Sequence, residues 1–169
     1  MAGPKSDERA WVRGAQAGSA SDFEALFRTY WPNAYRTAYL VVHDAAAAED
    51  IAQEAFLAAV RNLDRFDRRR PFGPWLHRIV VNRAIDWSRR RALRSEVPLY
   101  ESPVEQPPPD IGPDTVARMQ QLSPEHRAVI VLRHLLGYTP GEIARILELP
   151  RGTVNSRLRR GLDELKGRV

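Results

Sequence analysis

The sequence predicts an all-α protein made of two small helical domains, and three observations support this fold class. Apolar residues recur at helical spacing through most of the chain, with no convincing strand alternation and no internal repeat. Side chains that cap helices precede several of these apolar runs. A proline-rich, acidic stretch separates the two helical parts, and it is expected to join them as a linker.

The stretch SEVPLYESPVEQPPPDIGPD, residues 95–114, is the clearest break in the helical pattern. Its six prolines remove backbone donors and bias their neighbours away from helix, so an extended linker is expected. The resulting boundaries are a first domain over residues 1–94, a linker over 95–113 and a second domain over 114–169. A surface loop within a single domain is the alternative.

Four helices are expected in the first domain and four shorter ones in the second. The expected caps and starts in the first domain are Ser6, Ser21 with Glu24 in a capping box, Asp44 and about Pro74. Those in the second are Asp114, Ser123 with Pro124, Thr139 with Pro140 and Glu142, and about Arg151. Gly137 suits a helix end, and Pro32 is expected to kink the second helix.

Charge is segregated along the chain. The formal net charge is +5 and the sequence pI is about 10.1, which favours a polyanionic partner. Eleven arginines and three aspartates lie between residues 61 and 94. Residues 95–117 contain five carboxylates and no basic residue. The basic segment and the acidic linker are therefore expected to have different partners.

Composition also excludes several classes of protein. The absence of cysteine excludes disulfides, thiolate metal sites and a cysteine nucleophile. No stretch approaches the roughly 20 apolar residues of a membrane span, and the N-terminus has no apolar run of signal-peptide length. We expect a cytoplasmic protein with no membrane insertion. The histidines are scattered and no glycine-rich phosphate loop occurs, so no metal, cofactor or catalytic activity is expected.

The last helix, in PRGTVNSRLRRGLDEL, has distinct faces. Its apolar side consists of Val154, Leu158, Gly161, Leu162 and Leu165. The opposite side consists of Ser156, Arg159 and Arg160, with Asn155 and Arg157 at the flanks. A capped short helix, a three-residue turn and a second helix with outward polar residues form the helix-turn-helix pattern. The segment is predicted to bind DNA in the major groove, and a structural hairpin with a solvated basic face is the alternative.

Two helices of the first domain also have polar faces. In AEDIAQEAFLAAVRNL, one face holds Asp50, Gln53, Glu54, Leu57 and Arg61. Two acids near a helix start are commonly just favourable dipole partners, and spacing alone favours that interpretation. An exposed leucine rimmed by polar groups instead indicates a protein contact.

In PFGPWLHRIVVNRAIDWSRRR, the polar line consists of Arg78, Asn82 and Arg89, with Asp86 beside it. Basic and amide groups interleaved with aromatic residues suit a single-stranded or melted nucleic acid. Core positions for Trp75 and Trp87 are the alternative. Val81 and Ile85 do not fit this amphipathic pattern.

Taken together, these segments resemble the extracytoplasmic-function (ECF) group of bacterial sigma factors, over about residues 22–165. AEDIAQEAFLAAVRNLDRF resembles the group's core-polymerase-binding helix, FGPWLHRIVVNRAIDWSRRR its promoter-melting helix, and LSPEHRAVIVLRHLLGYTPGEIARILELPRGTVNSRLRRGLDEL its −35-reading domain. The resemblance implies a protein without catalysis that brings RNA polymerase to promoters and opens the −10 element.

The resemblance also implies roles for individual residues. Contacts to the polymerase clamp helices would come from Asp50, Gln53, Glu54 and Leu57. Contacts to the −10 DNA would come from Arg78, Asn82, Arg83, Asp86 and Arg89, with Phe66 to Phe72 as the loop that holds a flipped base. Contacts to the −35 DNA would come from Arg151, Thr153, Asn155, Ser156, Arg157, Arg159 and Arg160.

The implied partners are core RNA polymerase, through its clamp helices and flap, and promoter DNA as duplex and as melted non-template strand. An anti-sigma factor is a further implied partner, and polymerase would hold the protein at the nucleoid. The main alternative is a helix-turn-helix regulator whose first domain senses a ligand or partner. That interpretation leaves AEDIAQEAF and the arginine-rich fourth helix unexplained. An enzyme is a distant third.

Overall fold

The computed structural model describes residues 4–94, 108 and 110–167. All regular secondary structure in these ranges is helical, which confirms the all-α class. Most of the predicted linker, residues 95–113, lies outside the described residues.

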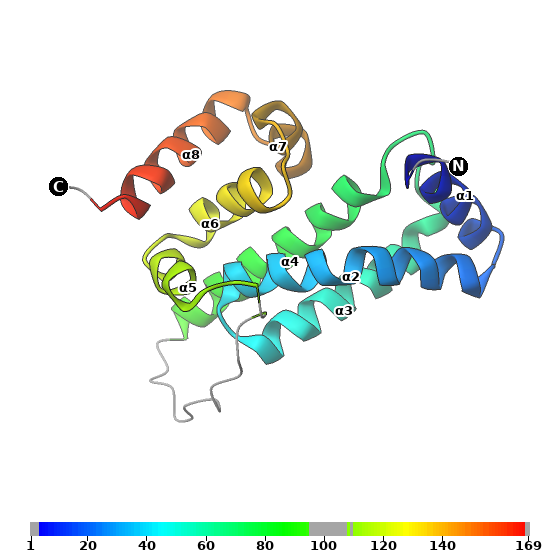
Figure 1. The fold of residues 1–169 in the computed structure, drawn as a ribbon, viewed down its shortest axis with the longest axis horizontal. Coiled ribbons are helices and arrows are strands. Elements are labelled where there is room, and N and C mark those ends of the chain that lie inside the picture. Colours follow the sequence, from blue (N-terminus) through cyan, green and yellow to red (C-terminus); the bar gives the residue numbers. More distant parts are fainter. Residues whose placement is uncertain (1–3, 95–107, 109, 168–169) are drawn as a thin grey trace.

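The first half of the chain forms four long helices and one short turn. These are α1 (Pro4–Gln16), α2 (Ala20–Val42), α3 (Ala45–Asn62), the 3₁₀ turn η1 (Leu63–Arg65) and α4 (Phe72–Leu93). Helices α2, α3 and α4 pack on one another, and α1 lies across one end of α2 (Figure 1). This bundle holds the polar faces that the sequence indicates on α3 and α4.

Local capping explains where two of these helices begin. Asp44 accepts a hydrogen bond from the amide of Ala47 at 2.9 Å, which confirms the predicted cap of α3. The predicted cap of α2 at Ser21 is wrong, because Ser19 accepts from the amide of Asp22 instead. Gly18 adopts φ +92 just before it, and this left-handed turn lets the helix begin two residues early. Ser6 lies inside α1 rather than before it.

The second half forms shorter helices, which gather over one side of the α2 to α4 bundle (Figure 1). They are α5 (Pro113–Gln120), α6 (Pro124–Ile130) with the π turn η2 (Val131–Leu135), α7 (Pro140–Leu147) and α8 (Arg151–Leu165). The cap of α6 at Ser123 and the capping box of α7 between Thr139 and Glu142 are confirmed. The predicted cap at Asp114 is wrong, since Gly112 precedes the helix and Pro113 occupies its first position.

Helices α7 and α8 form the expected helix-turn-helix. Glu148 ends α7 in the left-handed conformation, with φ 53, and α8 begins three residues later. A Cβ on Gly161 would lie 2.6 Å from Cδ1 of Ile130, so the glycine permits a close approach of α8 to α6. This contact holds α8, the second helix of the helix-turn-helix, against α6.

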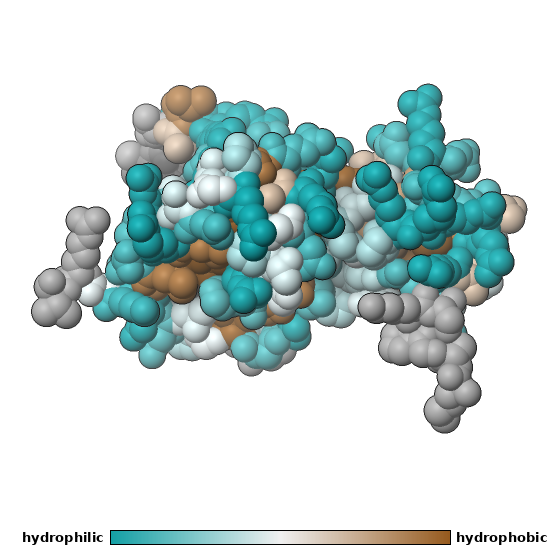
Figure 2. Space-filling model, turned by 90° about the horizontal axis from the view of Figure 1, so that it is seen from above, coloured by the Kyte–Doolittle hydropathy of each residue, from teal (hydrophilic) through white to brown (hydrophobic). Residues whose placement is uncertain are grey.

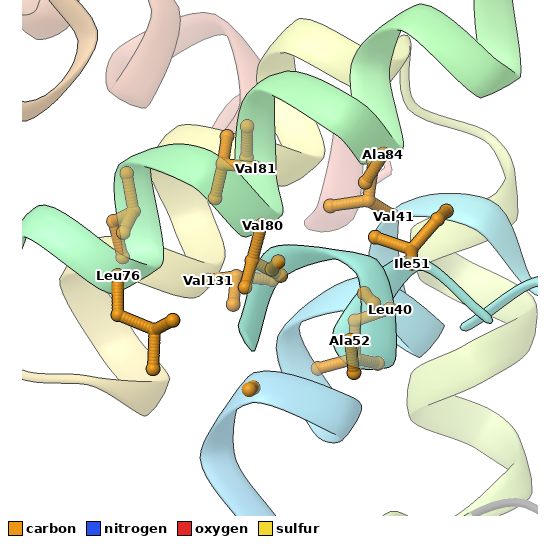
Figure 3. Packing of buried hydrophobic residues seen from close by; sticks show 14 of the residues in the cluster. Leu40, Val41, Ile51, Ala52, Leu76, Val80, Val81, Ala84 and Val131 are labelled. Atoms are coloured by element: carbon orange, nitrogen blue, oxygen red, sulfur yellow. The ribbon is translucent and has the colours of Figure 1, made fainter. Parts of the chain in front are cut away.

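The core continues from one half of the chain into the other. Figure 3 shows Leu40 and Val41 of α2, Ile51 of α3, Val80 of α4 and Val131 of η2 among the gathered apolar side chains. Helix α4 packs on α2 and α3 and also on α6 and α7. Its position between the two halves gives it two buried faces.

Candidate polymerase and nucleic-acid interfaces

The expected polymerase-binding face of α3 lies at the surface. Asp50 and Gln53 are exposed, and Leu57 has 54% of its surface accessible although it is a large apolar residue. Ile51 and Ala55 are buried on the other side of the helix, against the core. An exposed leucine with polar neighbours has the composition of a protein-binding surface.

The expected −10 face of α4 is largely engaged by carboxylates. The ion pairs are Arg78–Glu148 at 2.7 Å, Arg83–Glu54 at 2.9 Å and Arg89–Glu125 at 2.6 Å. Asn82 and Asp86 are exposed on the same face. The Arg83 pair connects α4 to the exposed face of α3, while the other two pairs reach from α4 to the second half of the chain.

The loop before α4 borders a cleft of about 780 Å³. Its lining includes Arg65, Arg70, Trp75 and Arg78 from the first half and Arg145 from α7. Two side chains expected to contact a flipped base are not available in this arrangement. Phe72 is fully buried and Phe66 is nearly so, and both rings pack against the ring of Trp75. Of these three rings, Trp75 alone is only half-buried.

Helix α8 presents basic residues on the side away from the core. Val154 and Leu158 are buried against the other helices, as the periodicity predicts. The exposed polar residues of the predicted set are Arg151, Asn155, Arg159 and Arg160, and the half-buried ones are Thr153, Ser156 and Arg157. From above, hydrophilic side chains cover most of the molecule, with smaller hydrophobic areas between them (Figure 2). Helix α8 has the distribution of side chains that a major-groove reader needs.

Several residues that connect the two halves were not singled out from the sequence. Arg127 of α6 donates three hydrogen bonds to backbone carbonyl oxygens at two helix ends. Nη1 donates to Val41 of α2 at 2.6 Å, while Nε and Nη2 donate to Met119 and Gln120 of α5 at 2.9 and 3.0 Å. A cation suits the negative end of each helix dipole.

Tyr138, in the loop before α7, reaches the buried His77 of α4. The hydroxyl oxygen lies 2.8 Å from Nδ1 of His77, within hydrogen-bond distance. Burial lowers the pKa of His77 to about 4 and raises the pKa of Tyr138 above its ordinary value. Both groups are therefore neutral near pH 7, and the contact is a neutral hydrogen bond. Val81 and Ile85 were the features of the sequence that could have indicated this buried side of α4. Both are buried, as His77 is, and the three residues follow one another at intervals of four.

The described part of the chain contains neither a cluster of metal-ligating side chains nor a membrane-spanning helix. No group of three or more His, Asp or Glu side chains there could hold a metal ion. None of its helices combines the length and the apolar character needed to cross a bilayer.

Two family models match the chain. Sigma-70 region 2 matches residues 26–94, and Sigma-70 region 4 matches residues 115–165. The first match includes α3 and α4, and the second includes the helix-turn-helix. These two matches, to different regions of the same class of protein, place the chain in the sigma-70 class.

Sequence comparison with individual proteins identifies the group within the sigma-70 class to which the chain belongs. The chain is 34% identical over 164 residues to the ECF RNA polymerase sigma factor SigE of Mycolicibacterium smegmatis, covering 90% of this chain and 63% of the relative. It is 31% identical over 173 residues to the ECF RNA polymerase sigma factor SigW of Bacillus subtilis, covering 92% of each chain. The chain belongs to the ECF group of RNA polymerase sigma factors.

Solved structures agree on the fold. CnrH, in complex with the cytosolic domain of CnrY, superimposes with a TM-score of 0.72 at 25% sequence identity, over 95% of each chain. RpoE of Bartonella quintana, in complex with the anti-sigma factor NepR, superimposes with a TM-score of 0.73 at 23% identity. That alignment covers 87% of this chain and 96% of RpoE.

Proposed function

We propose that the protein binds core RNA polymerase, directs it to specific promoters and begins the melting of the −10 element. The observation that supports this proposal is that one chain carries three separate polar faces. Its two halves match Sigma-70 region 2 and Sigma-70 region 4. The faces are on α3 around Leu57, on α4 around Asn82 and on α8 around Arg160. A helix-turn-helix regulator would need only the last of them.

Each face has its own proposed task. The face of α3, with Asp50, Gln53, Glu54 and Leu57, binds the clamp helices of polymerase. The face of α4, with Arg78, Asn82, Arg83, Asp86 and Arg89, binds the melted non-template strand, whose bases and phosphates suit amide and guanidinium groups. The face of α8 reads the −35 duplex through the residues predicted from the sequence. Phe66 and Phe72 are left out as base contacts because their rings are packed in the core.

The protein performs no catalysis of its own in this proposal, and polymerase supplies the chemistry. It acts in the cytoplasm, at the nucleoid while polymerase holds it. An anti-sigma factor is a proposed further partner, because RpoE, which has a related fold, is found in a complex with the anti-sigma factor NepR.

The experiment combines co-purification and transcription. Leu57→Asp places a charge at the centre of the α3 face, so it should abolish co-purification with core polymerase and abolish transcripts from a genomic DNA library. Leu93→Asp is the matched control, since Leu93 is 84% exposed at the far end of α4 and should tolerate the change. Equal co-purification of well-folded Leu57→Asp and wild-type protein would contradict the proposal.

A further inference from the structure

Helix α1 precedes the part of the chain that the Sigma-70 region 2 model matches, which begins at residue 26. It nevertheless packs on η1, the turn that follows α3, as well as on α2 (Figure 1). The turn η1 leads directly into the loop that is expected to hold a flipped base. Helix α1 therefore contacts the base of a proposed DNA-binding loop although the family match does not include it.

Gln16, the last residue of α1, makes the polar contact with this segment. Its side-chain amide nitrogen donates to the carbonyl oxygen of Leu63 at 3.0 Å and to that of Phe66 at 2.9 Å. A carboxamide nitrogen has two N–H donors, and both find an acceptor here. The opposite orientation of the amide would be repulsive, because its oxygen would then face two carbonyl oxygens. The contact therefore requires a donor at this position and not merely a polar side chain.

Helix α1 is itself fixed against α2, so a contact from its end can restrain the loop. Val12 is almost fully buried in the core. The hydroxyl of Tyr30 on α2 donates a hydrogen bond to the carboxylate of Glu8. A Cβ on Gly14 would collide with the side chain of Asp22, so α1 and the start of α2 approach each other closely. The last residue of α1 is thus held in place by the bundle.

The backbone hydrogen bonds of the loop itself are local. Within the described part of the chain, the amide of Phe66 donates to the carbonyl of Leu63, and that of Arg70 donates to the carbonyl of Asp67. The Asp67 carboxylate also accepts from the amide and the guanidinium of Arg69. These bonds shape the loop without joining its backbone to another helix. The two hydrogen bonds from α1 supply such a connection.

The exposed part of the loop gains most from a fixed base. Residues 68–70 are three consecutive exposed arginines, whose like charges repel one another and favour several conformations. The ring of Phe66 also packs against that of the half-buried Trp75, with 4.6 Å between their centroids. Fixing the backbone of Phe66 therefore fixes both the start of the basic turn and the ring that supports Trp75. A loop that is ordered before binding loses less conformational freedom when its ligand binds.

We infer that α1 positions this loop for the melted −10 strand, and that Gln16 is the positioning residue through which α1 acts. The inference rests on the proposed function, because it requires the loop to contact the melted strand. Gln16 does not contact DNA in this arrangement. Its two hydrogen bonds hold the loop in the conformation that receives an unstacked base, so their loss should weaken recognition of that base in particular.

The test compares two substitutions of Gln16 with a matched control. Gln16→Met keeps a long, unbranched side chain of high helix propensity but has no donor. Gln16→Lys keeps N–H donors on a flexible side chain and should recover most of the loss. Gln121→Met is the same substitution at an exposed position at the end of α5, and it should behave as the wild type.

Hydrogen exchange in the full chain measures the loop without DNA. In Gln16→Met, the amides of residues 66–70 should exchange about five- to tenfold faster, while those of α3 and α4 should keep their wild-type rates. A general loss of stability would instead accelerate exchange in the helices as well.

Binding of the holoenzyme to a pre-melted promoter measures recognition. A promoter recovered from the genomic DNA library is prepared as a bubble, with one abasic site placed at each non-template position of the −10 element in turn. In the wild type, one of these sites should lower affinity by about tenfold, because the loop loses its base. In Gln16→Met, the effect of that site should shrink to about twofold, while the effects of the other sites should stay unchanged.

Each outcome has a distinct meaning. Unchanged exchange of the loop in Gln16→Met would overturn its positioning by α1. Faster exchange with an undiminished effect of the abasic site would overturn the part that α1 has in recognition. A lysine variant as impaired as the methionine variant would overturn the need for a donor. If no abasic site lowered the affinity of the wild type, the proposed function of the −10 face would itself have failed, and the inference with it.

Discussion

The guanidinium of Arg127 lies against the end of α2, with Nη1 2.6 Å from the carbonyl oxygen of Val41. The remaining donors of the same group bind carbonyls at the end of α5. One side chain therefore ties α6 both to its own half of the chain and to the other half. Burial also lowers the pKa of Arg127 below its ordinary value.

Arg127→Met should lower the free energy of unfolding by about 2–3 kcal/mol, because three carbonyls lose a charged donor. Arg127→Lys should fall between methionine and wild type, since an ammonium group cannot span all three acceptors. Urea unfolding followed by circular dichroism measures both. The control is Arg118→Met on the exposed side of α5, where a loss of no more than about 0.5 kcal/mol is expected. Equal losses at the two positions would contradict the bridging role.

Stability should fall in mild acid because of His77. The pKa of this histidine drops from 6.5 to about 4 on folding, chiefly through burial. Between those values the unfolded chain binds a proton that the folded chain does not, so the free energy of unfolding rises with pH across the window. The free energy of unfolding should therefore be lower at pH 4 than above pH 6.5 by up to about 3 kcal/mol, and the loss should develop as the pH falls between these values.

His77→Asn should flatten this dependence while keeping an acceptor for Tyr138. His43, whose pKa is also about 4 through burial and the nearby Arg127, should leave a residual slope. Urea titrations at several pH values test the prediction, with His134→Gln at an exposed position as control. A variant at position 77 with the wild-type slope would show that His77 is not the titrating group.

The sequence was most informative where side chains act on nearby backbone. The cap at Asp44 and the capping box of Thr139 were predicted because their partners lie only three residues away. The start of a helix was predicted wrongly where backbone conformation determines it, as at the left-handed turn of Gly18 before α2. The pairing of Arg78 with Glu148 was out of reach, since it depends on contacts between distant helices. Val81 and Ile85 were the residues that indicated a second packing surface on α4. Two large apolar side chains beside a polar face are stable there when another helix covers them.

Asn82 is exposed on α4, so the loss of its side-chain amide should have little effect on folding. In the proposed function, its amide contacts an unstacked base. Asn82→Ala should raise the barrier to promoter melting by about 1–3 kcal/mol and leave binding to duplex promoter unchanged. Permanganate footprinting with polymerase measures melting, and a gel shift measures binding.

Asn62→Ala provides a control at another exposed asparagine, at the end of α3. It should melt promoters at the wild-type rate. If Asn82→Ala lost melting and duplex binding in equal measure, Asn82 would be a general binding residue rather than a base reader.

Arg160 and Arg157 lie on the same helix but should make different contributions to −35 binding. Arg160 is exposed on the side opposite Val154 and Leu158, where a base edge would lie. Arg157 is half-buried at the flank, where a phosphate would lie. Arg160→Ala should cost about 1–3 kcal/mol on the preferred sequence and relax discrimination at one base pair. Arg157→Ala should weaken binding to all sequences and lower the salt slope by about one.

The measurement is a salt titration of both variants in the full chain against matched and mismatched −35 duplexes. A base contact acts only when the correct base is present, so its loss should shrink the gap between the two duplexes. A phosphate contact acts on both duplexes alike, and its loss releases fewer counterions on binding. A uniform loss for Arg160→Ala together with a loss of selectivity for Arg157→Ala would reverse the two assignments. Both substitutions lie on the same helix and each removes one positive charge, so each variant serves as the matched control for the other.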